Sequence, residues 1–313
     1  MTTNSTSGVY ATLPDLIRMN GLATGFSFLP RQPVHSLLAG AHASKLRGRG
    51  LNFEELRRYL PGDDIRQIDW KVTARTRKPH VRVYTEERER PVFLVVDQRL
   101  SMFFGSQRNL KSVTAAEAAA LAAWRTIAVK DRVGAVAFND SQTYEIRPHR
   151  SRATVMSILQ RVVELNHRLR VDSTDRPNPQ MLNNALRRAA RLAPHDCLIV
   201  IITDGDGGDA ETQQIATQTA QHNDVLVVFV FDPLEAELPS VGRMVVSDGQ
   251  RELDFDSHSA SLRRDYQSDF VAIRQKAHHF LMTRDVPVLP LSTAEPTIDQ
   301  FLHHLSVHAR RHA

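Results

Sequence analysis

Two carboxylates, each placed directly after a short apolar run, are the residues of this sequence best suited to chemistry. The run Val92–Val96 ends in Asp97, and the run Leu198–Ile202 is followed by Thr203 and Asp204. Unbroken apolar runs of this length are typical of strands buried on both faces of a sheet. Open α/β sheets place their ligand sites at the carboxyl ends of strands. If the two strands are neighbours, Asp97 and Asp204 converge on one crevice.

These two acids and the hydroxyl of Ser101 form a set of hard oxygen ligands. Such a set suits Mg²⁺ or Mn²⁺ that keeps several of its waters. The alternative is that the same side chains cap the helices that follow and bond loop amides. The residue types leave both interpretations open, so the cofactor expected here is Mg²⁺, Mn²⁺ or none.

Other chemistries lack residues that they need. An Asp-x-Asp phosphotransfer site requires an acid where Arg99 stands, and the sequence contains neither a Gly-rich phosphate loop ending in Lys-Ser/Thr nor a Gly-x-Ser-x-Gly elbow. His304 and His308 have a zinc-compatible helical spacing, but no Cys lies near them, which favours a solvated face. A metal-dependent phosphoester hydrolase using Asp97 and Asp204 is the competing hypothesis, although it has no identifiable general base or nucleophile.

The composition is that of an ordinary globular chain. It has 313 residues, of which 42% are apolar and 24% charged. The longest apolar runs, 198–202 and 225–231, are much shorter than the roughly 20 residues that a membrane span needs. The N-terminus shows no secretory signal pattern, and the one cysteine, Cys197, lies in an apolar strand. We therefore expect a cytoplasmic protein.

Excess positive charge is concentrated in residues 45–90. They contain 13 Lys/Arg and 8 Asp/Glu, a net +5 (13 − 8) that equals the net charge of the whole chain (40 − 35). This segment is the expected electrostatic contact surface. Because its charges are mixed in sign and its aromatic residues are few, a protein partner or a solvated face is favoured over nucleic acid.

Strand and helix patterns alternate from residue 91 onward. The expected strands cover residues 80–85, 92–97, 132–138, 143–146, 197–203, 225–231 and 288–291, with a hairpin at 243–254 around Asp248-Gly249. The expected helices cover residues 13–22, 111–129, 155–165, 182–192, 212–222, 262–280 and 298–305. This alternation predicts an α/β fold with a doubly wound, mostly parallel sheet over residues 91–313, preceded by an N-terminal helical and strand extension, residues 1–90.

Turn chemistry organises part of the N-terminal extension. The Pro-Gly pair at 61–62 is a strong turn signal. Asp63 or Asp64 is placed to cap a helix that begins at Ile65, because a carboxylate accepts hydrogen bonds from unpaired first-turn amides.

Two motifs carry a family resemblance. Asp97-Gln98-Arg99-Leu100-Ser101 and Thr203-Asp204-Gly205 resemble the metal-ion-dependent adhesion site of a von Willebrand factor A-type domain. The run from Arg57 to Trp70, which contains Pro-Gly-Asp-Asp and Ile-Asp-Trp, resembles a bacterial von Willebrand A-like family labelled domain of unknown function fifty-eight. The resemblance extends from about residue 40 to about residue 310. It implies a six-stranded Rossmann-like core, a non-enzymatic role, and a MoxR-type AAA+ ATPase as partner, since members are commonly encoded beside one.

The chain departs from the adhesion-site pattern Asp-x-Ser-x-Ser at Arg99, which replaces the first Ser. By spacing, Gln180 stands where the pattern has a Thr, and Thr174 is a looser candidate. A guanidinium beside two carboxylates supplies the positive charge that a cation would bring. We therefore expect a degenerate site, in which Arg99 occupies or electrostatically blocks the metal position.

The function expected from these features is that of an adaptor or assembly partner. The degenerate metal site comprises Asp97, Ser101 and Asp204. The residues expected to contact the partner are Arg99, Gln180, Asp206, Arg57, Arg58, Asp63, Asp64, Asp69, Trp70 and Arg75.

Overall fold

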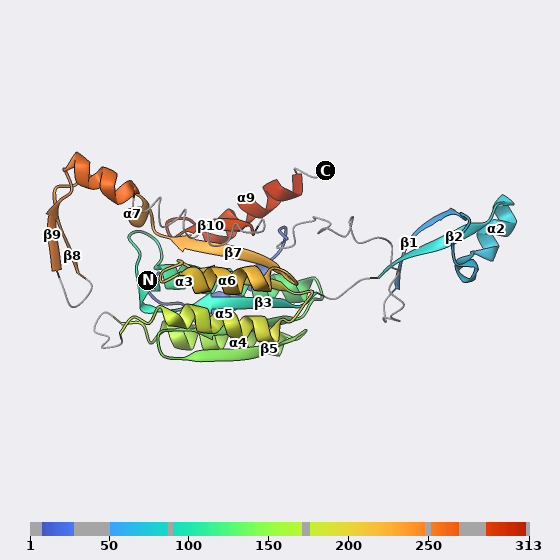
Figure 1. The fold of residues 1–313 in the computed structure, drawn as a ribbon, viewed down its shortest axis with the longest axis horizontal. Helices are drawn as coiled ribbons and strands as arrows, with labels where there is room; N and C mark the ends of the chain where they lie inside the picture. Colours follow the sequence, from blue (N-terminus) through green and yellow to red (C-terminus); the bar gives the residue numbers. More distant parts are fainter. Residues whose placement is uncertain are drawn as a thin grey trace, which may run out of the picture. The chain divides into compact units, whose positions relative to one another are not determined.

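A computed structural model of the chain describes residues 8–27, 51–86, 90–170, 176–247, 252–268 and 286–310. Its internal contacts divide the chain into two units, shown as ribbons in Figure 1. The main unit combines Met1–Arg31 with Arg90–Ala313, and the small unit is Gln32–Glu89. This division differs from the predicted boundary at residue 90, because the first part of the chain groups with the main unit.

The main unit is built on a six-stranded sheet with the order β10-β7-β6-β3-β4-β5. Its strands are β3 (Val92–Asp97), β4 (Val133–Phe138), β5 (Thr143–His149), β6 (Leu198–Thr203), β7 (Asp224–Phe231) and β10 (Val288–Ser292). All neighbouring strands are parallel except β4 and β5. Every residue of β3, β4 and β6 is buried, as expected of strands packed on both faces. The predicted mixed α/β class with a mostly parallel sheet is confirmed.

Helices flank the sheet of the main unit (Figure 1). They are α1 (Leu13–Arg18), α3 (Lys111–Ala128), α4 (Arg152–Asn166), α5 (Gln180–Leu192), α6 (Ala210–Thr219), α7 (Pro233–Ala236) and α9 (Thr297–Arg310). Successive residues of β3 point to opposite faces. Leu94 and Val96 pack with α1, α3, α4 and α9, whereas Phe93 and Val95 pack with α5 and α6. The two hydrophobic cores are consistent with a doubly wound fold.

Residues 8–27 are anchored in the core of the main unit. Leu16 is 1% exposed, and its carbonyl accepts a hydrogen bond from the indole nitrogen of Trp124 at 2.9 Å. The backbone nitrogen of Ala11 donates to the side-chain oxygen of Asn166 at 2.8 Å. These contacts explain why this segment belongs with the main unit.

Cys197 lies directly before β6 and is 3% exposed. Its backbone nitrogen donates to the side-chain oxygen of Asn223 at 3.0 Å. The predicted burial of this thiol is confirmed. Across the described ranges, no helix combines the length and the apolar character that crossing a membrane requires.

The predicted hairpin and C-terminal helix are only partly within the described residues. The hairpin strands are β8 (Arg243–Ser247) and β9 (Glu252–Asp256), which pair antiparallel as predicted. The expected turn at 248–249 lies outside the described residues. Of the helix predicted at 262–280, residues 260–268 are helical and 269–285 lie outside the described residues.

The small unit is a two-stranded hairpin with a helical insertion. Its elements are β1 (Leu51–Arg58), the 3-10 turn η2 (Ile65–Gln67), α2 (Trp70–Thr76) and β2 (His80–Glu86). The two strands pair antiparallel, with an irregularity in β1 between Phe53 and Glu55.

The predicted helix start at Ile65 and the cap at Asp64 are confirmed, but this helix is only the 3-10 turn η2, because the chain is extended at Ile68. Asp64 accepts a hydrogen bond of 2.9 Å from within η2 and caps only that turn. Asp69 then accepts two hydrogen bonds, of 3.0 and 3.1 Å, from the first turn of α2. A short polar side chain that bonds its own downstream amides starts a new helix instead of continuing the previous one.

Candidate functional site

The C-terminal ends of β3 and β6 lie side by side, because these strands pair in parallel. Asp97 and Asp204 therefore meet at one edge of the sheet, as predicted. Side chains fill the crevice that was expected between them: Asp97 is 0% exposed, Arg99 2%, Lys111 3% and Asp204 7%. We call these four residues together with Glu235 the strand-end cluster.

Arg99 is bonded to Asp97 through both its backbone and its side chain. Its backbone nitrogen donates to Asp97 Oδ1 at 3.0 Å, its Nε donates to both carboxylate oxygens at 3.0 and 3.1 Å, and its Nη2 donates to Oδ2 at 2.7 Å. Nη2 also donates to the carbonyl of Asp206 at 3.0 Å and lies 3.9 Å from Asp204 Oδ1. Thr203 Oγ1 adds a hydrogen bond of 2.7 Å to Asp97 Oδ2. Such a planar, forked pair requires a guanidinium.

Lys111 is the second buried cation of the strand-end cluster. Its Nζ lies 2.9 Å from Asp204 Oδ2 and 2.6 Å from Glu235 Oε1. The other oxygen of Glu235 accepts a hydrogen bond of 2.9 Å from the backbone nitrogen of Asp232, at the start of α7. Lys111 therefore joins the end of β6 to the helix that follows β7. As the first residue of α3 it lies at a helix end that disfavours cations, and the two carboxylates offset this effect.

The pKa values of the cluster follow from burial and opposite charge. Burial alone would raise the pKa of Asp204, but Lys111 and Arg99 outweigh it and lower that pKa. Burial alone would lower the pKa of Arg99 and of Lys111, yet the nearby carboxylates raise both. These three groups are therefore charged at neutral pH.

Two further acids at this edge have raised pKa values. Partial burial of its carboxyl, followed by the charge of Asp204, raises the pKa of Asp206, and partial burial raises that of Asp140. The backbone nitrogen of Asp206 donates to Asp204 Oδ1 at 3.0 Å. The carboxylate of Asp140 accepts from the backbone nitrogens of Leu100 and Asn178, both at 2.7 Å. These acids order the loops that follow β3, β4 and β6.

Three other residues were predicted for this edge, and the structure describes two of them, Ser101 and Gln180. The Oγ of Ser101 is buried and has no hydrogen-bond partner within the described part of the chain. Gln180 is exposed at the first residue of α5, and Pro179 before it packs against Gly207. A Cβ at Gly207, where φ is +71°, would come within 2.4 Å of Pro179, so the loop after β6 lies against the start of α5. Thr174 lies outside the described residues.

Sequence analysis did not identify Lys111, Glu235 or Asp232. Asp232 follows the apolar strand β7 just as Asp97 and Asp204 follow theirs, so the same pattern could have found it. Lys111 gave a weaker signal, a cation at the expected start of an Ala-rich helix. No local pattern pointed to Glu235, because its contact with Lys111 joins residues 124 positions apart.

A divalent cation does not fit among these side chains as they are arranged. Both oxygens of Asp97 accept from Arg99, and Asp204 Oδ2 accepts from Lys111, so the lone pairs that would face a metal are engaged. Of the three predicted ligands, Ser101 alone keeps an unpartnered oxygen, as judged from the described ranges. No group of three or more His, Cys, Asp or Glu side chains in those ranges could hold a metal ion.

The small unit includes three large apolar side chains that are at least 60% exposed. Leu60 is 60% exposed, Ile65 62% and Trp70 67%. Asp63, by contrast, accepts two hydrogen bonds from Arg57, at 2.7 and 2.8 Å, and these lower the pKa of its carboxyl. Exposed apolar groups of this size are typical of interaction surfaces when they are contiguous.

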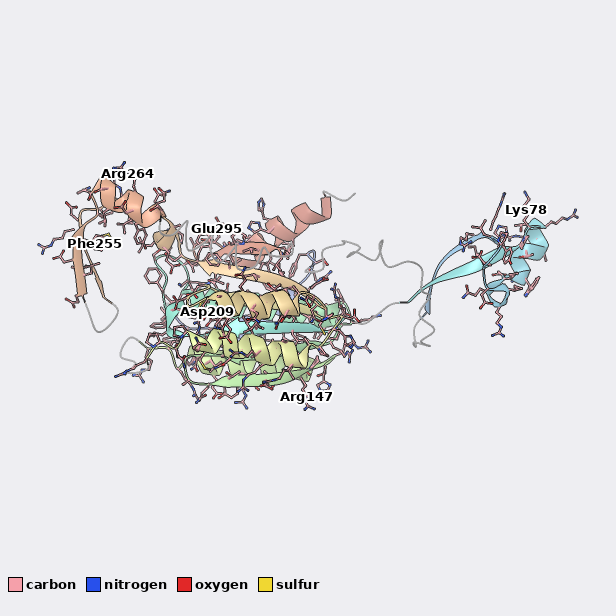
Figure 2. The ribbon with its side chains drawn as sticks, in the orientation of Figure 1. Lys78, Arg147, Asp209, Phe255, Arg264 and Glu295 are labelled. Atoms are coloured by element: carbon pink, nitrogen blue, oxygen red, sulfur yellow. The ribbon has the colours of Figure 1, made fainter. Side chains whose placement is uncertain are left out.

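Among the side chains of this unit that the structure describes, more basic than acidic groups are exposed. Its exposed basic residues include Arg58, Arg66, Lys71, Arg75, Arg77 and Lys78. Figure 2 shows Lys78 projecting from this unit. Three acids are engaged within the unit: Asp63 pairs with Arg57, Asp64 caps η2, and Asp69 is an 8% exposed cap.

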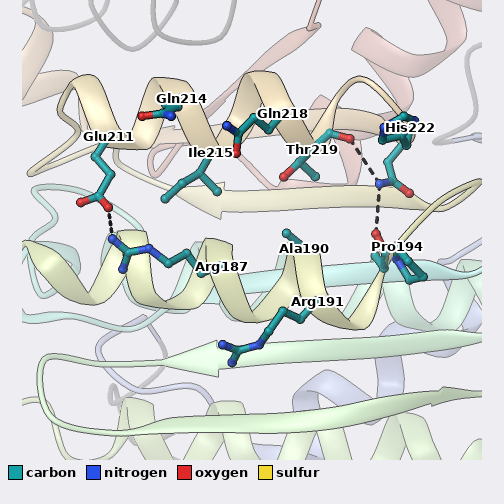
Figure 3. Close-up of a pocket in the computed structure, with 12 residues that line it drawn as sticks. Arg187, Ala190, Arg191, Pro194, Glu211, Gln214, Ile215, Gln218, Thr219 and His222 are labelled. Atoms are coloured by element: carbon teal, nitrogen blue, oxygen red, sulfur yellow. Dashed lines mark hydrogen bonds and ion pairs between the residues drawn. The ribbon is translucent and has the colours of Figure 1, made fainter.

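An open groove of about 500 Å³ runs between α5 and α6 (Figure 3). Arg187 and Glu211 form an ion pair across it. At its other end the side chain of Asn223 donates to the carbonyls of Ala193 and Thr219 at 3.0 and 3.2 Å. None of the predicted site residues lines this groove, so it is separate from the strand-end cluster.

Comparisons with known proteins identify relatives by sequence. Residues 55–276 match the family described as "Protein of unknown function DUF58". "Uncharacterized protein Rv1480" of Mycobacterium tuberculosis (strain ATCC 25618 / H37Rv) is 31% identical over 267 residues, which cover 84% of this chain and 81% of the relative. "Uncharacterized protein Mb1516" of Mycobacterium bovis gives the same values.

Two solved structures show weaker likeness. A conserved hypothetical protein BatB from Bacteroides thetaiotaomicron is 14% identical with a TM-score of 0.40, over 71% of this chain and 99% of that one. An aerotolerance-related membrane protein from Bacteroides fragilis NCTC 9343 is 13% identical with a TM-score of 0.39 and the same coverage. Neither likeness is close enough to establish a shared fold.

Proposed function

The chain belongs to the family described as "Protein of unknown function DUF58", and we propose that it is a protein-interaction module and not an enzyme. The partner that we propose is a MoxR-type AAA+ ATPase, met in the cytoplasm, for which the chain is an adaptor or assembly factor. This partner follows from the resemblance of the Pro-Gly-Asp-Asp and strand-end motifs to von Willebrand A-like proteins.

The observation that carries the proposal is the internal pairing of the strand-end cluster. A general base or a nucleophile needs a lone pair that can reach a substrate. Asp97 accepts hydrogen bonds from Arg99 and Thr203 on a fully buried carboxylate, and Asp204 is paired with Lys111. This arrangement supports a structural role for both acids over the competing hypothesis of a phosphoester hydrolase.

Partner contacts at this edge are proposed for residues that are exposed. Gln180 and Asp206 meet this condition, whereas Arg99, which was expected to face the partner, is 2% exposed. The loop after β6 is held in place by Arg99, which donates to the Asp206 carbonyl. Arg99 is therefore a positioning residue in this proposal.

The small unit supplies the second proposed contact. Trp70, Ile65 and Leu60 are exposed apolar anchors, a type of residue that dominates binding energy when a partner covers it. Exposed Arg58 and Arg75 would add electrostatic attraction to an acidic surface. Asp63, Asp64 and Asp69, which were also expected at the interface, would act by fixing the turns that display these side chains.

The experiment is co-purification of the tagged full chain from the source cell. Wild type is compared with Trp70→Ser and Leu60→Ser, and the recovered proteins are identified by mass spectrometry. We expect a MoxR-type ATPase with wild type, reduced at least about tenfold by either substitution, since anchor residues typically contribute 2 kcal/mol or more. The matched control is Leu253→Ser in β9, which removes a leucine that is 65% exposed, compared with 60% for Leu60.

Two results would overturn the proposal. If no AAA+ ATPase is enriched with wild type, the proposed partner is wrong. If the purified chain hydrolyses phosphoesters and Asp97→Asn abolishes the turnover, the interaction module is an enzyme and the competing hypothesis holds.

A further inference from the structure

Two cations of the chain itself neutralise most of the negative charge of the strand-end cluster. Asp97, Asp204 and Glu235 carry three negative charges, and Arg99 and Lys111 carry two positive charges, so the net charge is −1 (−3 + 2). A divalent cation would contribute the same two positive charges. We propose that Arg99 and Lys111 together replace a divalent cation at this edge of the sheet, so that neither Mg²⁺ nor Mn²⁺ binds there.

The guanidinium of Arg99 lies between the two carboxylates that would share a metal. Its Nη2 is 2.7 Å from Asp97 Oδ2 and 3.9 Å from Asp204 Oδ1. A Mg²⁺ or Mn²⁺ ion bridging the same pair would have to approach these oxygens to about 2.0–2.3 Å. The ion and the guanidinium therefore compete for one position.

Lys111 takes the remaining side of Asp204. Its ammonium bonds Oδ2 of Asp204 and, through Glu235, extends the charge pairing to the segment after β7. Asp97 is the last residue of β3 and Asp204 directly follows β6, so the two cations link the ends of three strands that are consecutive in the sheet, β3, β6 and β7. A metal entering here would face two buried positive charges at short range, where repulsion is poorly screened.

The hydroxyl of Ser101, the third predicted metal ligand, takes no part in the hydrogen bonds of the strand-end cluster. Its Oγ is buried and has no hydrogen-bond partner in the described part of the chain, although it occupies the last position of the Asp-x-Ser-x-Ser spacing. Removing the guanidinium at Arg99 would take away its three side-chain hydrogen bonds to Asp97 and leave those from the Arg99 backbone and from Thr203. Arg99→Ser would restore the full spacing and is expected to create the metal site.

This inference goes beyond the proposed function, and it holds whichever partner binds. It also predicts that any partner contact at this edge is insensitive to chelators. A failure to find the ATPase partner would therefore not contradict the absence of a metal at the strand-end cluster. A bound metal, in turn, would not contradict the proposed partner.

The test is titration of the purified full chain with Mn²⁺, followed by isothermal calorimetry and by electron paramagnetic resonance of the free ion. We expect wild type to show no saturable site in the millimolar range. Arg99→Ser is expected to bind one Mn²⁺ per chain and to gain about 5 °C or more in Tm at about 100-fold excess over Kd. The matched control is Arg161→Ser, which removes an arginine paired with Glu164 on the surface and should bind no Mn²⁺.

The wild-type result decides the proposal even if a variant does not fold. A stoichiometric Mn²⁺ site in wild type that Asp97→Asn removes would overturn it. If Arg99→Ser unfolds in chelator, refolding it with Mn²⁺ should recover the native circular dichroism spectrum. A variant that stays folded and binds no Mn²⁺ would show that the guanidinium does not occupy the metal position.

Discussion

The strand-end cluster and the small unit contain similar residues in opposite environments. In the cluster, Arg99 and Lys111 are 2% and 3% exposed and are paired with carboxylates. In the small unit, Lys71 and Arg75 are exposed on α2, and Trp70, the first residue of that helix, is 67% exposed. A buried charge must be paired or it destabilises the fold, whereas an exposed charge costs little and is available to a partner.

The comparison separates the motif that resembles a ligand site from the surface that is free to bind. The strand-end motif is occupied by the chain's own cations and supports the sheet. In the small unit, Asp64 and Asp69 cap turns and Asp63 holds Arg57, while other basic groups and apolar groups are exposed. Stability and binding are therefore expected to respond to different substitutions.

The largest effect on stability is expected from Lys111→Met. It removes the cation bonded to the carboxylates of Asp204 and Glu235 and leaves Asp204 with Arg99 alone, at 3.9 Å; breaking a buried pair in this way costs about 3–5 kcal/mol. Urea unfolding followed by circular dichroism gives the free energy of unfolding. The matched control is Lys71→Met on the small unit, for which we expect a change within about 0.5 kcal/mol. Equal effects at the two lysines would remove the distinction between the two regions.

A smaller loss of stability is expected from Arg99→Lys, because lysine keeps the positive charge but not the forked arrangement of N–H donors. The hydrogen bonds of Nε and Nη2 to Asp97 cannot all be replaced by an ammonium, and hydrogen bonds to charged groups contribute about 1.5–3 kcal/mol. The same urea titration measures the change. A variant as stable as wild type would show that charge alone, without geometry, holds this edge.

The third effect is a dependence of stability on pH. The pKa of Asp204 is lowered from its ordinary 3.8 mainly by Lys111, once the opposing effect of burial is overcome. Its contribution is therefore fully present above pH 3.8 and is lost as the pH falls through the lower folded-state value. The pKa values of Asp206 and Asp140 are raised, so these two acids lower the free energy of unfolding as the pH rises above 3.8.

We expect the free energy of unfolding of wild type to decrease below pH 3.8, and Asp204→Asn to lose part of this decrease. Urea titrations between pH 3 and pH 6 measure both. Parallel curves for the two proteins would mean that other carboxyls carry the acid dependence.

The smallest effect on stability is expected from Trp70→Ser. The indole is 67% exposed, so little burial is lost, and surface substitutions usually change the free energy of unfolding by less than about 0.5 kcal/mol. Thermal and urea unfolding measure this change beside Leu253→Ser. A loss above about 2 kcal/mol would show that Trp70 is packed within the chain and is not a docking residue.

The sequence predicted the sheet well because its signals are local. The runs that became β3, β6 and β7 are continuous apolar segments, and each is followed by an acid. The pairing of Lys111 with Glu235 was not predictable in this way, since it depends on which helix start meets which strand end. The break at Asp69 was missed because the helical spacing of apolar residues continues through it. The side chain of Asp69 nevertheless accepts from first-turn amides of α2 and so starts a new helix.

The rate at which a reagent labels Cys197, the only cysteine of the chain, can report how often β6, the strand before Asp204, opens. Cys197 precedes β6, the strand that ends at Thr203, and burial raises the pKa of its thiol. A thiol reagent can reach it only when this part of the sheet opens. If Arg99 and Lys111 hold the strand ends in place, replacing either residue should accelerate labelling of Cys197, which lies at the opposite end of β6 from Asp204. Labelling faster than the free energy of unfolding of the whole chain allows would indicate fraying of β6 alone, and no engineered probe is needed.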